Sequence, residues 1–398
     1  MLRIIKFELK KMYSQSIVIG SLVVLLLICL LLLQAYCYNN SSTVTIMPDG
    51  TKLSGRAAIL YNQSIAKRYT GNFSDDTITQ MVSDFSTDYP EEYYLMTESG
   101  EFNSSIPSAY WYLNMFIAPK NYNEIAQDAI NHGTSIPPLT ENGLISVHNY
   151  NISYIDKPLQ YGYGDSWVFF FLGFCGSTIT MAIPALIVII IAISTIFSSE
   201  YNTKMDALIL TTRYGKNKQI IAKLSACWIF TTILIGGLFI IFSIAFGVQY
   251  GLLGGSADIQ TNFGLSLMAA EIPFNNLQLL IFGLIIVWFA GIFTAAVTAM
   301  LSSITKTPFS SLIVAFVLFV APGIIRQILT QGPLRDIMII FPVNAVNAQE
   351  VLLLPINVQS IFYGNPYAPA ICIGIATFII TLFSSSVAYN AFRHHQVI

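Results

Sequence analysis

The polar segment Ser198–Lys223 carries the side chains best suited to bind a partner protein. It lies between two long apolar stretches and mixes charged with apolar residues. An apolar anchor inside a polar rim is typical of protein–protein docking sites. The candidate contact residues, on a predicted short helix and its flanks, are Glu200, Met205, Leu208, Ile209, Thr211 and Arg213. The alternative is a basic loop that only fixes the orientation of the chain in a membrane.

Signatures of catalysis are missing from the sequence. Gly215-Lys216 is followed by Asn217, and no glycine lies five residues before Gly215, so there is no P-loop for ATP. No metalloprotease, serine-hydrolase or paired-carboxylate pattern falls inside an apolar stretch. The five cysteines lie in or at the end of apolar stretches and form no disulfide or metal-binding pattern. We therefore predict that the chain is not an enzyme, has no catalytic residue and binds no metal or cofactor itself.

Hydroxyl side chains are the main polar groups within the apolar stretches. Candidates for lining a translocation path are Ser177, Thr178, Thr231, Thr294 and Thr298. The alternative is that these small residues let helices pack closely. No charged residue falls at the middle of a stretch, which argues against a proton- or ion-driven transporter and against a charge-lined channel.

Six apolar stretches must position these groups. Each is long enough to cross a hydrocarbon layer about 30 Å thick as a helix. They are Ile17–Tyr36, Trp167–Phe197, Leu224–Tyr250, Leu277–Leu301, Phe309–Leu329 and Tyr367–Phe392. The sequence therefore predicts an α-helical polytopic membrane protein, located in the cell membrane and surrounded by the lipid bilayer. Prolines divide the half-apolar segment 322–366, which predicts short helices dipping into the outer leaflet.

The basic residues predict the orientation. They gather before the first stretch, between the second and third, and after the last. Segment 38–166 carries fourteen acidic and six basic residues instead. By the positive-inside rule, both termini are cytoplasmic and 38–166 is extracellular.

Segment 38–166 is long enough to form a domain, predicted to be small, mixed and mainly helical. Turn residues Pro48-Asp49-Gly50-Thr51 divide two short extended runs within Val44–Leu53. Helices are expected over Ser54–Tyr69, after an N-capping Ser74, and over Asn121–Asn131, and a strand over Val147–Ile155. Aromatic residues are dense after Tyr89, and those singled out as possible ligand contacts are Tyr110, Trp111 and Tyr112. The alternative is that these aromatics form the domain core or a belt at the lipid interface.

Four segments resemble type-2 ABC exporter permeases, the membrane subunits of ATP-driven exporters. The loop after the second stretch is similar to their coupling helix, through Glu200, the run Leu208-Ile209-Leu210-Thr211-Thr212, Arg213 and Lys223. The N-terminal segment Leu2–Met12 looks like their amphipathic connecting helix, and Pro322–Pro366 like their outer re-entrant region. The chain also resembles members from Firmicutes that carry a domain between the first two spans. The residues that carry this resemblance are Asp49-Gly50, Leu53-Ser54-Gly55 and Ala58-Ile59. Asn202-Thr203 departs from the Gly-Thr of many members.

The resemblance implies a permease that exports an apolar or amphipathic cargo, such as a peptide, antibiotic or lipid. Its partners would be two copies of an ABC ATPase, which hold ATP and magnesium, and a second permease chain, identical or related; no nucleic acid is implied. The organisation would be a connecting helix at 1–14, a first span at 15–37, the extracellular domain at 38–166, a second span at 167–197, the coupling loop at 198–223, and four spans at 224–398 with the re-entrant segment at 322–366. The alternative is a membrane-anchored extracellular sensor for peptides, although no sizeable inner signalling domain is predicted.

Overall fold

The computed structural model describes residues 1–99, 105–118, 127, 131, 139–147, 158–177, 179–205, 208, 211, 215 and 217–394. The chain is mainly helical, and strands are few and short. Among the described residues, six helical segments are long and apolar enough to cross a membrane: Ser16–Tyr38, Ala182–Asn202, Lys218–Tyr250, Asn276–Ile304, Pro308–Ile328 and Ala368–Arg393. The prediction of six membrane-length apolar helices is confirmed.

The chain divides into two compact units. We name the first the helical unit, made of Met1–Leu33, Leu172–Ser243 and Ile281–Ile398. The second, the insert unit, combines Gln34–Phe171 with Ile244–Leu280. The insert unit is therefore larger than the domain predicted at 38–166, because the connection between the third and fourth membrane-length helices belongs to the same compact body.

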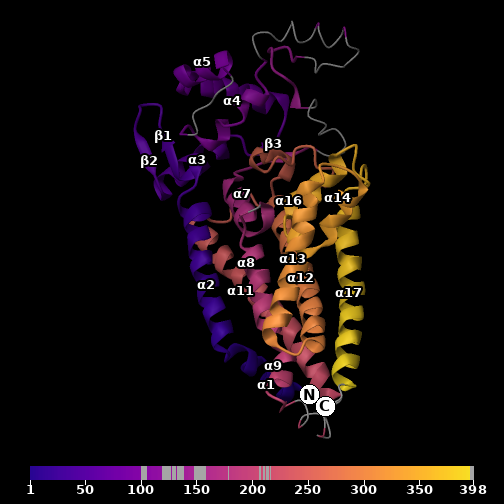
Figure 1. Cartoon of the computed structure of the whole chain (residues 1–398). Coiled ribbons are helices and arrows are strands. Elements are labelled where there is room, and N and C mark those ends of the chain that lie inside the picture. Colours follow the sequence, from indigo (N-terminus) through magenta and orange to yellow (C-terminus); the bar gives the residue numbers. More distant parts are fainter. Residues whose placement is uncertain are drawn as a thin grey trace. The chain divides into compact units, whose positions relative to one another are not determined.

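The helical unit begins with α1 (Leu2–Tyr13), which is amphipathic as predicted. Its longer helices are α2 (Ser16–Leu33), α8 (Ala182–Ile193), α13 (Pro308–Ile328), α17 (Ala368–Arg393) and the larger parts of α11 (Lys218–Tyr250) and α12 (Asn276–Ile304). Its short helices include α9 (Ser198–Asn202), α14 (Pro333–Ile337), α15 (Pro342–Ala345) and α16 (Ala348–Leu353). Helices α1 and α9 and the end of α17 lie at one end of this unit, and α14 and α16 lie at the other (Figure 1).

The second apolar stretch is not one continuous helix, contrary to the prediction for Trp167–Phe197. Helix α7 (Asp165–Phe171) passes into a π-helical turn at Leu172–Gly176, and α8 starts only at Ala182. Ser177 competes with the backbone at this break, since its hydroxyl accepts a hydrogen bond from the Ile179 N–H at 3.2 Å. Pro184 lies in the first turn of α8, where no helical partner for its missing N–H is needed.

Short helices follow α13, as the prolines predicted. They are α14 (Pro333–Ile337), α15 (Pro342–Ala345) and α16 (Ala348–Leu353). Helix α13 continues through Pro322 to Ile328, as the apolar stretch Phe309–Leu329 predicted, so the first part of segment 322–366 belongs to this helix. The carbonyl of Pro322 accepts a hydrogen bond from the Asn344 side chain at 3.2 Å.

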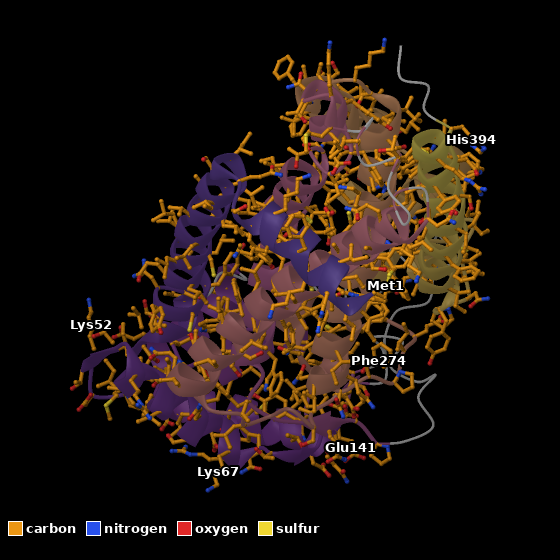
Figure 2. All side chains as sticks on the ribbon, turned by 90° about the horizontal axis from the view of Figure 1, so that it is seen from below. Met1, Lys52, Lys67, Glu141, Phe274 and His394 are labelled. Atoms are coloured by element: carbon orange, nitrogen blue, oxygen red, sulfur yellow. The ribbon has the colours of Figure 1, made fainter. Side chains whose placement is uncertain are left out.

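The insert unit starts with a hairpin of β1 (Val44–Ile46) and β2 (Lys52–Ser54), in which Thr45 pairs with Leu53. Helices α3 (Arg56–Arg68), α4 (Asp75–Asp88) and α5 (Pro90–Ser99) follow. Ser74 caps α4 as predicted, accepting a hydrogen bond from the Thr77 N–H. Lys52 and Lys67 point outward from this unit (Figure 2). The helix expected at 121–131 and the strand expected at 147–155 lie outside the described residues, apart from Gln127, Asn131 and Val147.

Segment 244–280 is bound into the insert unit by polar and aromatic contacts. Strand β3 (Gly71–Asn72) pairs with β4 (Gln160–Tyr161), and Asp258 forms two hydrogen bonds with the backbone of Gln160. The ring of Phe263 lies 5.7 Å from that of Phe73 and 5.6 Å from that of Phe116. The core of this unit therefore requires side chains from both parts of the sequence.

Gly254 lies where the two parts of the insert unit meet most closely. Its φ is +75°, and a Cβ there would lie 1.9 Å from the Tyr163 carbonyl oxygen. We expect Gly254→Ala to lower the free energy of unfolding of the purified chain by more than about 3 kcal/mol, because backbone atoms would have to separate. Denaturant unfolding followed by tryptophan fluorescence measures this change.

Gly251 is the matched control. Its φ is +76°, but a Cβ added at this position would meet no other atom within 4 Å. Gly251→Ala should cost only the backbone strain of about 1–2 kcal/mol. Equal losses for the two variants would contradict the close approach at Gly254.

Candidate functional site

A buried cluster of charges joins three elements at one end of the helical unit. The ammonium group of Lys223 lies 3.1 Å from Glu8 Oε2 and 2.6 Å from Glu200 Oε1. It also donates to the carbonyl oxygen of Ile196 at 3.0 Å, so all three of its N–H groups have acceptors. Glu200 Oε1 accepts a further hydrogen bond from Lys11 at 2.9 Å. The four side chains carry two positive and two negative charges, so the cluster is neutral.

Helical spacing explains how α1 and α11 reach the cluster. Glu8 and Met12 are four residues apart on α1 and are the buried residues of that helix. Gln219 and Lys223 are likewise four residues apart on α11, and Gln219 Nε2 donates to Glu8 Oε1 at 2.6 Å. Lys223 itself has no exposed surface. Its three acceptors offset the large cost of burying its charge.

Ser302 on α12 positions α9. The Ser302 hydroxyl accepts hydrogen bonds from the N–H groups of Phe197 and Ser198, both at 3.1 Å. These groups lie at the start of α9, where a helix leaves N–H groups without internal partners. Glu200 follows in the first turn, where a carboxylate is favoured by the helix dipole. The Ser302 hydroxyl of α12 thus orients α9 and its Glu200 carboxylate, which Lys223 of α11 binds.

The predicted docking residues that the structure describes expose their apolar surface close in sequence to this cluster. Met205 is 49% exposed and Leu208 is 63% exposed. Thr211 is also exposed, and its hydroxyl donates to the Leu208 carbonyl oxygen. Ile209 and Arg213 lie outside the described residues. Glu200 is buried rather than exposed, so it belongs to the charge cluster and not to a contact surface.

The hydroxyl residues predicted to line a path are mostly packed between helices. Thr231, Thr294 and Thr298 are buried, and Thr294 donates to the Ala290 carbonyl within its own helix. At Gly291 on α12, an added Cβ would lie 2.9 Å from the Thr231 methyl group on α11. This contact supports the helix-packing alternative. Ser177 lines a cavity of the helical unit, and Thr178 lies outside the described residues.

The aromatic residues singled out in the insert unit lie in its core. Tyr110 has no exposed surface, and Trp111 is 6% exposed and donates from Nε1 to the Ile106 carbonyl at 2.8 Å. Tyr112 is half-buried, with its ring 5.6 Å from that of Phe263. Burial raises the pKa of Tyr110 to about 12 although its hydrogen bond to Tyr69 lowers it, so the group stays neutral. This burial favours the alternative of a domain core over a surface that contacts a ligand.

The insert unit does contain a cavity of about 640 Å³ at another place. Residues from α3, from β4 and from the 253–257 segment line it, including Gln63, Lys67, Gln160, Tyr161 and Ser256. This volume falls in the range of small-molecule sites. The sequence did not indicate the cavity, because its walls come from both separated segments.

No family model matches the chain, and no curated protein or solved structure matches it either. The fold itself gives the class: a mainly α-helical chain in whose described part six helices are long and apolar enough to cross a membrane. In the part of the chain that the structure describes, no group of three or more His, Cys, Asp or Glu side chains is placed to hold a metal ion.

The structural roles of Glu8, Lys11 and Lys223 were not predicted from the sequence. Lys223 is the end of the predicted loop, but it lies in the second turn of α11, which begins at Lys218. One signal was available: Glu8 is the single acid in the otherwise basic helix Leu2–Tyr13, and it shares a face with Met12. A lone acid on the apolar face of an amphipathic helix indicates a buried partner of opposite charge.

Replacing Lys223 should be far more harmful than replacing Lys11. Lys223→Met leaves the buried carboxylate of Glu8 without a counter-charge and that of Glu200 with only the partly exposed Lys11, and we expect a loss of about 3–5 kcal/mol in the free energy of unfolding. Lys11→Met removes a side chain that is 36% exposed and should cost less than about 1 kcal/mol. Denaturant unfolding of both purified variants gives the comparison.

A triple variant tests the cause of that loss. Glu8→Gln, Glu200→Gln and Lys223→Met together remove every fully buried charge of the cluster, and should recover most of the stability lost in Lys223→Met alone. A triple variant that is no more stable than the single one would show that shape, rather than charge, dominates at this site.

Proposed function

We propose that the chain is the membrane subunit of an ATP-driven exporter for an apolar or amphipathic cargo. The observation that carries the proposal is the buried charge cluster of Glu8, Glu200 and Lys223. It ties an amphipathic N-terminal helix, the segment after the second span and the start of the third span into one body. Met205 and Leu208 come shortly after Glu200 in the sequence and are exposed, as expected of residues that contact a separate ATPase.

The charge cluster suits the transmission of force. A push on the segment around Leu208 would reach α9, and through Lys223 it would reach α1 and α11. Separating these elements would expose or strand buried charges, which is costly, so they are expected to move together. Two ATPase copies and a second permease chain would complete the transporter, with ATP and magnesium bound only by the ATPase.

The composition of the spans supports the class of cargo. Side chains at their middle are apolar or bear only hydroxyl groups, and a charged cargo would find no counter-charge there. A peptide with apolar faces, an antibiotic or a lipid fits better. The insert unit would lie outside the cell, and the connecting helix and coupling loop would lie inside.

A second candidate function, a membrane-anchored sensor, is favoured by the cavity of the insert unit. A cavity of about 640 Å³ with Lys67 and Gln160 in its wall offers both apolar and polar contacts to a ligand. Under this hypothesis, ligand binding to the insert unit would be the primary event, and no ATPase would assemble with the chain.

Changing Met205 and Leu208 together to Asp separates these functions. As a permease, the double variant should reach the membrane but lose its complex with the ATPase, because each buried apolar anchor can contribute about 2 kcal/mol or more. Co-purification with P-loop ATPases expressed from the same genome, and the ATPase activity of the complex, provide the measurement. Leu60→Asp, at a 55% exposed position of the insert unit, is the matched control and should retain the complex. Failure of the unaltered chain to assemble with any of these ATPases would contradict the proposal.

Cysteine labelling tests the orientation. The natural Cys29, Cys37, Cys175 and Cys227 are buried, so background labelling in cells is expected to be low. With Cys372 replaced by Ser, single cysteines at Thr87 and Leu252 should react with an impermeant reagent from outside, and one at Thr211 should react only after the cells are opened. Leu252 is 77% exposed and therefore accessible to the reagent, whereas Gln260 in the same segment is fully buried and would not be labelled. Labelling of Thr211 in intact cells would reverse the proposed orientation.

A further inference from the structure

A cavity of about 500 Å³ lies in the helical unit, at the end opposite the Lys223 cluster. The last turns of α13, the short helices α14 to α16 and the break before α8 form its wall. Its charged lining residues are Arg326, Arg335 and Glu350. Two positive charges thus face one negative charge, so the cavity wall has a net charge of +1.

The guanidinium group of Arg326 has buried N–H donors without acceptors among the described residues. It is only 6% exposed, and its Nη1 donates to Glu350 Oε2 at 2.7 Å. Nη2 lies 2.7 Å from Glu350 Oε1 as an ion pair but without an aligned N–H, and Nε has no acceptor among the described residues. A buried donor without an acceptor is costly, and a guanidinium group presents five N–H groups in total. One carboxylate does not satisfy this side chain.

Glu350 is shared between the two arginines and is the only acidic residue in the wall of the cavity as the structure describes it. Arg335 Nη2 also donates to Glu350 Oε1, at 3.3 Å. Asp336 lies 3.9 Å from Arg335 Nη1, but its other oxygen accepts from the Ile361 N–H at 3.0 Å, and it does not line the cavity. An additional anion with several acceptor oxygens would satisfy both arginines.

The position of the cavity identifies the source of the anion. Arg326 is eighteen residues beyond Pro308, the first residue of α13, which places it about 27 Å along the helix axis. A hydrocarbon layer is about 30 Å thick, so the guanidinium group would reach the level of the lipid headgroups. Apolar side chains beside the cavity are exposed, with Ile328 at 73% and Leu334 at 54%. An amphiphile could place acyl chains on these residues and its headgroup on the arginines.

We propose that this cavity binds the phosphodiester group of a membrane phospholipid, with Arg326 and Arg335 as the ligands of the phosphate. Planar guanidinium groups bind phosphate through paired hydrogen bonds. Glu350 acts as an internal competitor that holds the arginines in place when no lipid is bound. This site does not depend on the proposed export function.

The test measures lipid affinity of the full chain in a neutral detergent. Phosphatidylglycerol is titrated while the midpoint of thermal unfolding is followed; diacylglycerol with the same acyl chains and inorganic phosphate serve as separate arms. We expect saturable stabilisation by phosphatidylglycerol alone. Arg326→Gln should weaken its apparent affinity about tenfold, the effect of one charge-assisted hydrogen bond. Glu350→Gln should strengthen it, because both arginines lose their internal partner.

The opposite signs of these two effects distinguish a lipid site from a structural ion pair. Should Arg326→Gln fail to fold, the double variant Arg326→Gln/Glu350→Gln leaves no unpaired carboxylate and should bind the lipid more weakly than Glu350→Gln alone, because these two variants differ only at Arg326. Arg68→Gln, in the insert unit, is the control and should leave the affinity unchanged. Equal affinity in Glu350→Gln and the double variant would overturn the proposal. So would equal stabilisation by diacylglycerol or by inorganic phosphate.

Discussion

The ion pairs of Lys223 are the constraint on which one end of the helical unit depends, because they fix three elements that are far apart in sequence. A buried ammonium group tolerates few arrangements: each N–H needs an acceptor, and here Glu8, Glu200 and the Ile196 carbonyl supply them. The register of α1 against α11 follows, since only the face with Glu8 and Met12 can turn inward. Apolar contacts alone would permit α1 to slide along a membrane surface, whereas a buried charge specifies one position.

The second constraint concerns the insert unit, whose core is shared between two segments separated by two membrane-length helices, Ala182–Asn202 and Lys218–Tyr250. Phe263 packs on Phe73 and Phe116, and Asp258 pairs with the backbone of Gln160. A shared core requires both segments to be on the same side of any membrane that the two helices cross. Two crossings return the chain to the side from which it started, which agrees with the alternation that the basic residues predict.

The sequence was sufficient for features that depend on local pattern. Six apolar runs predicted the six long helices, and Ser74 and the Pro48–Thr51 turn predicted the capped helix α4 and the first hairpin. The sequence was insufficient for features that depend on contacts between residues far apart in the chain. The break at Ser177 is hidden in an apolar run, and the pairing of Glu8 with Lys223 joins residues 215 positions apart. Aromatic density around Trp111 suggested a binding surface, yet composition cannot separate an exposed aromatic patch from a buried aromatic core.

The two charged clusters of the helical unit resemble each other in chemistry but differ in completeness. Around Lys223, each ammonium N–H has an acceptor, and four charges sum to zero. Around Arg326, a guanidinium Nε is unmatched among the described residues, and Glu350 serves both arginines while Asp336 lies 3.9 Å from Arg335 alone. Glu200 Oε2 also has no partner among the described residues, but every donor of the Lys223 ammonium group is paired, whereas the Arg326 guanidinium group keeps unpaired donors that an anion could accept from. The spans between the clusters bear no charge at mid-depth. The Arg326 cavity lies where α13 meets the short helices, since Arg326 binds Glu350 of α16 and the Pro322 carbonyl accepts from Asn344 of α15.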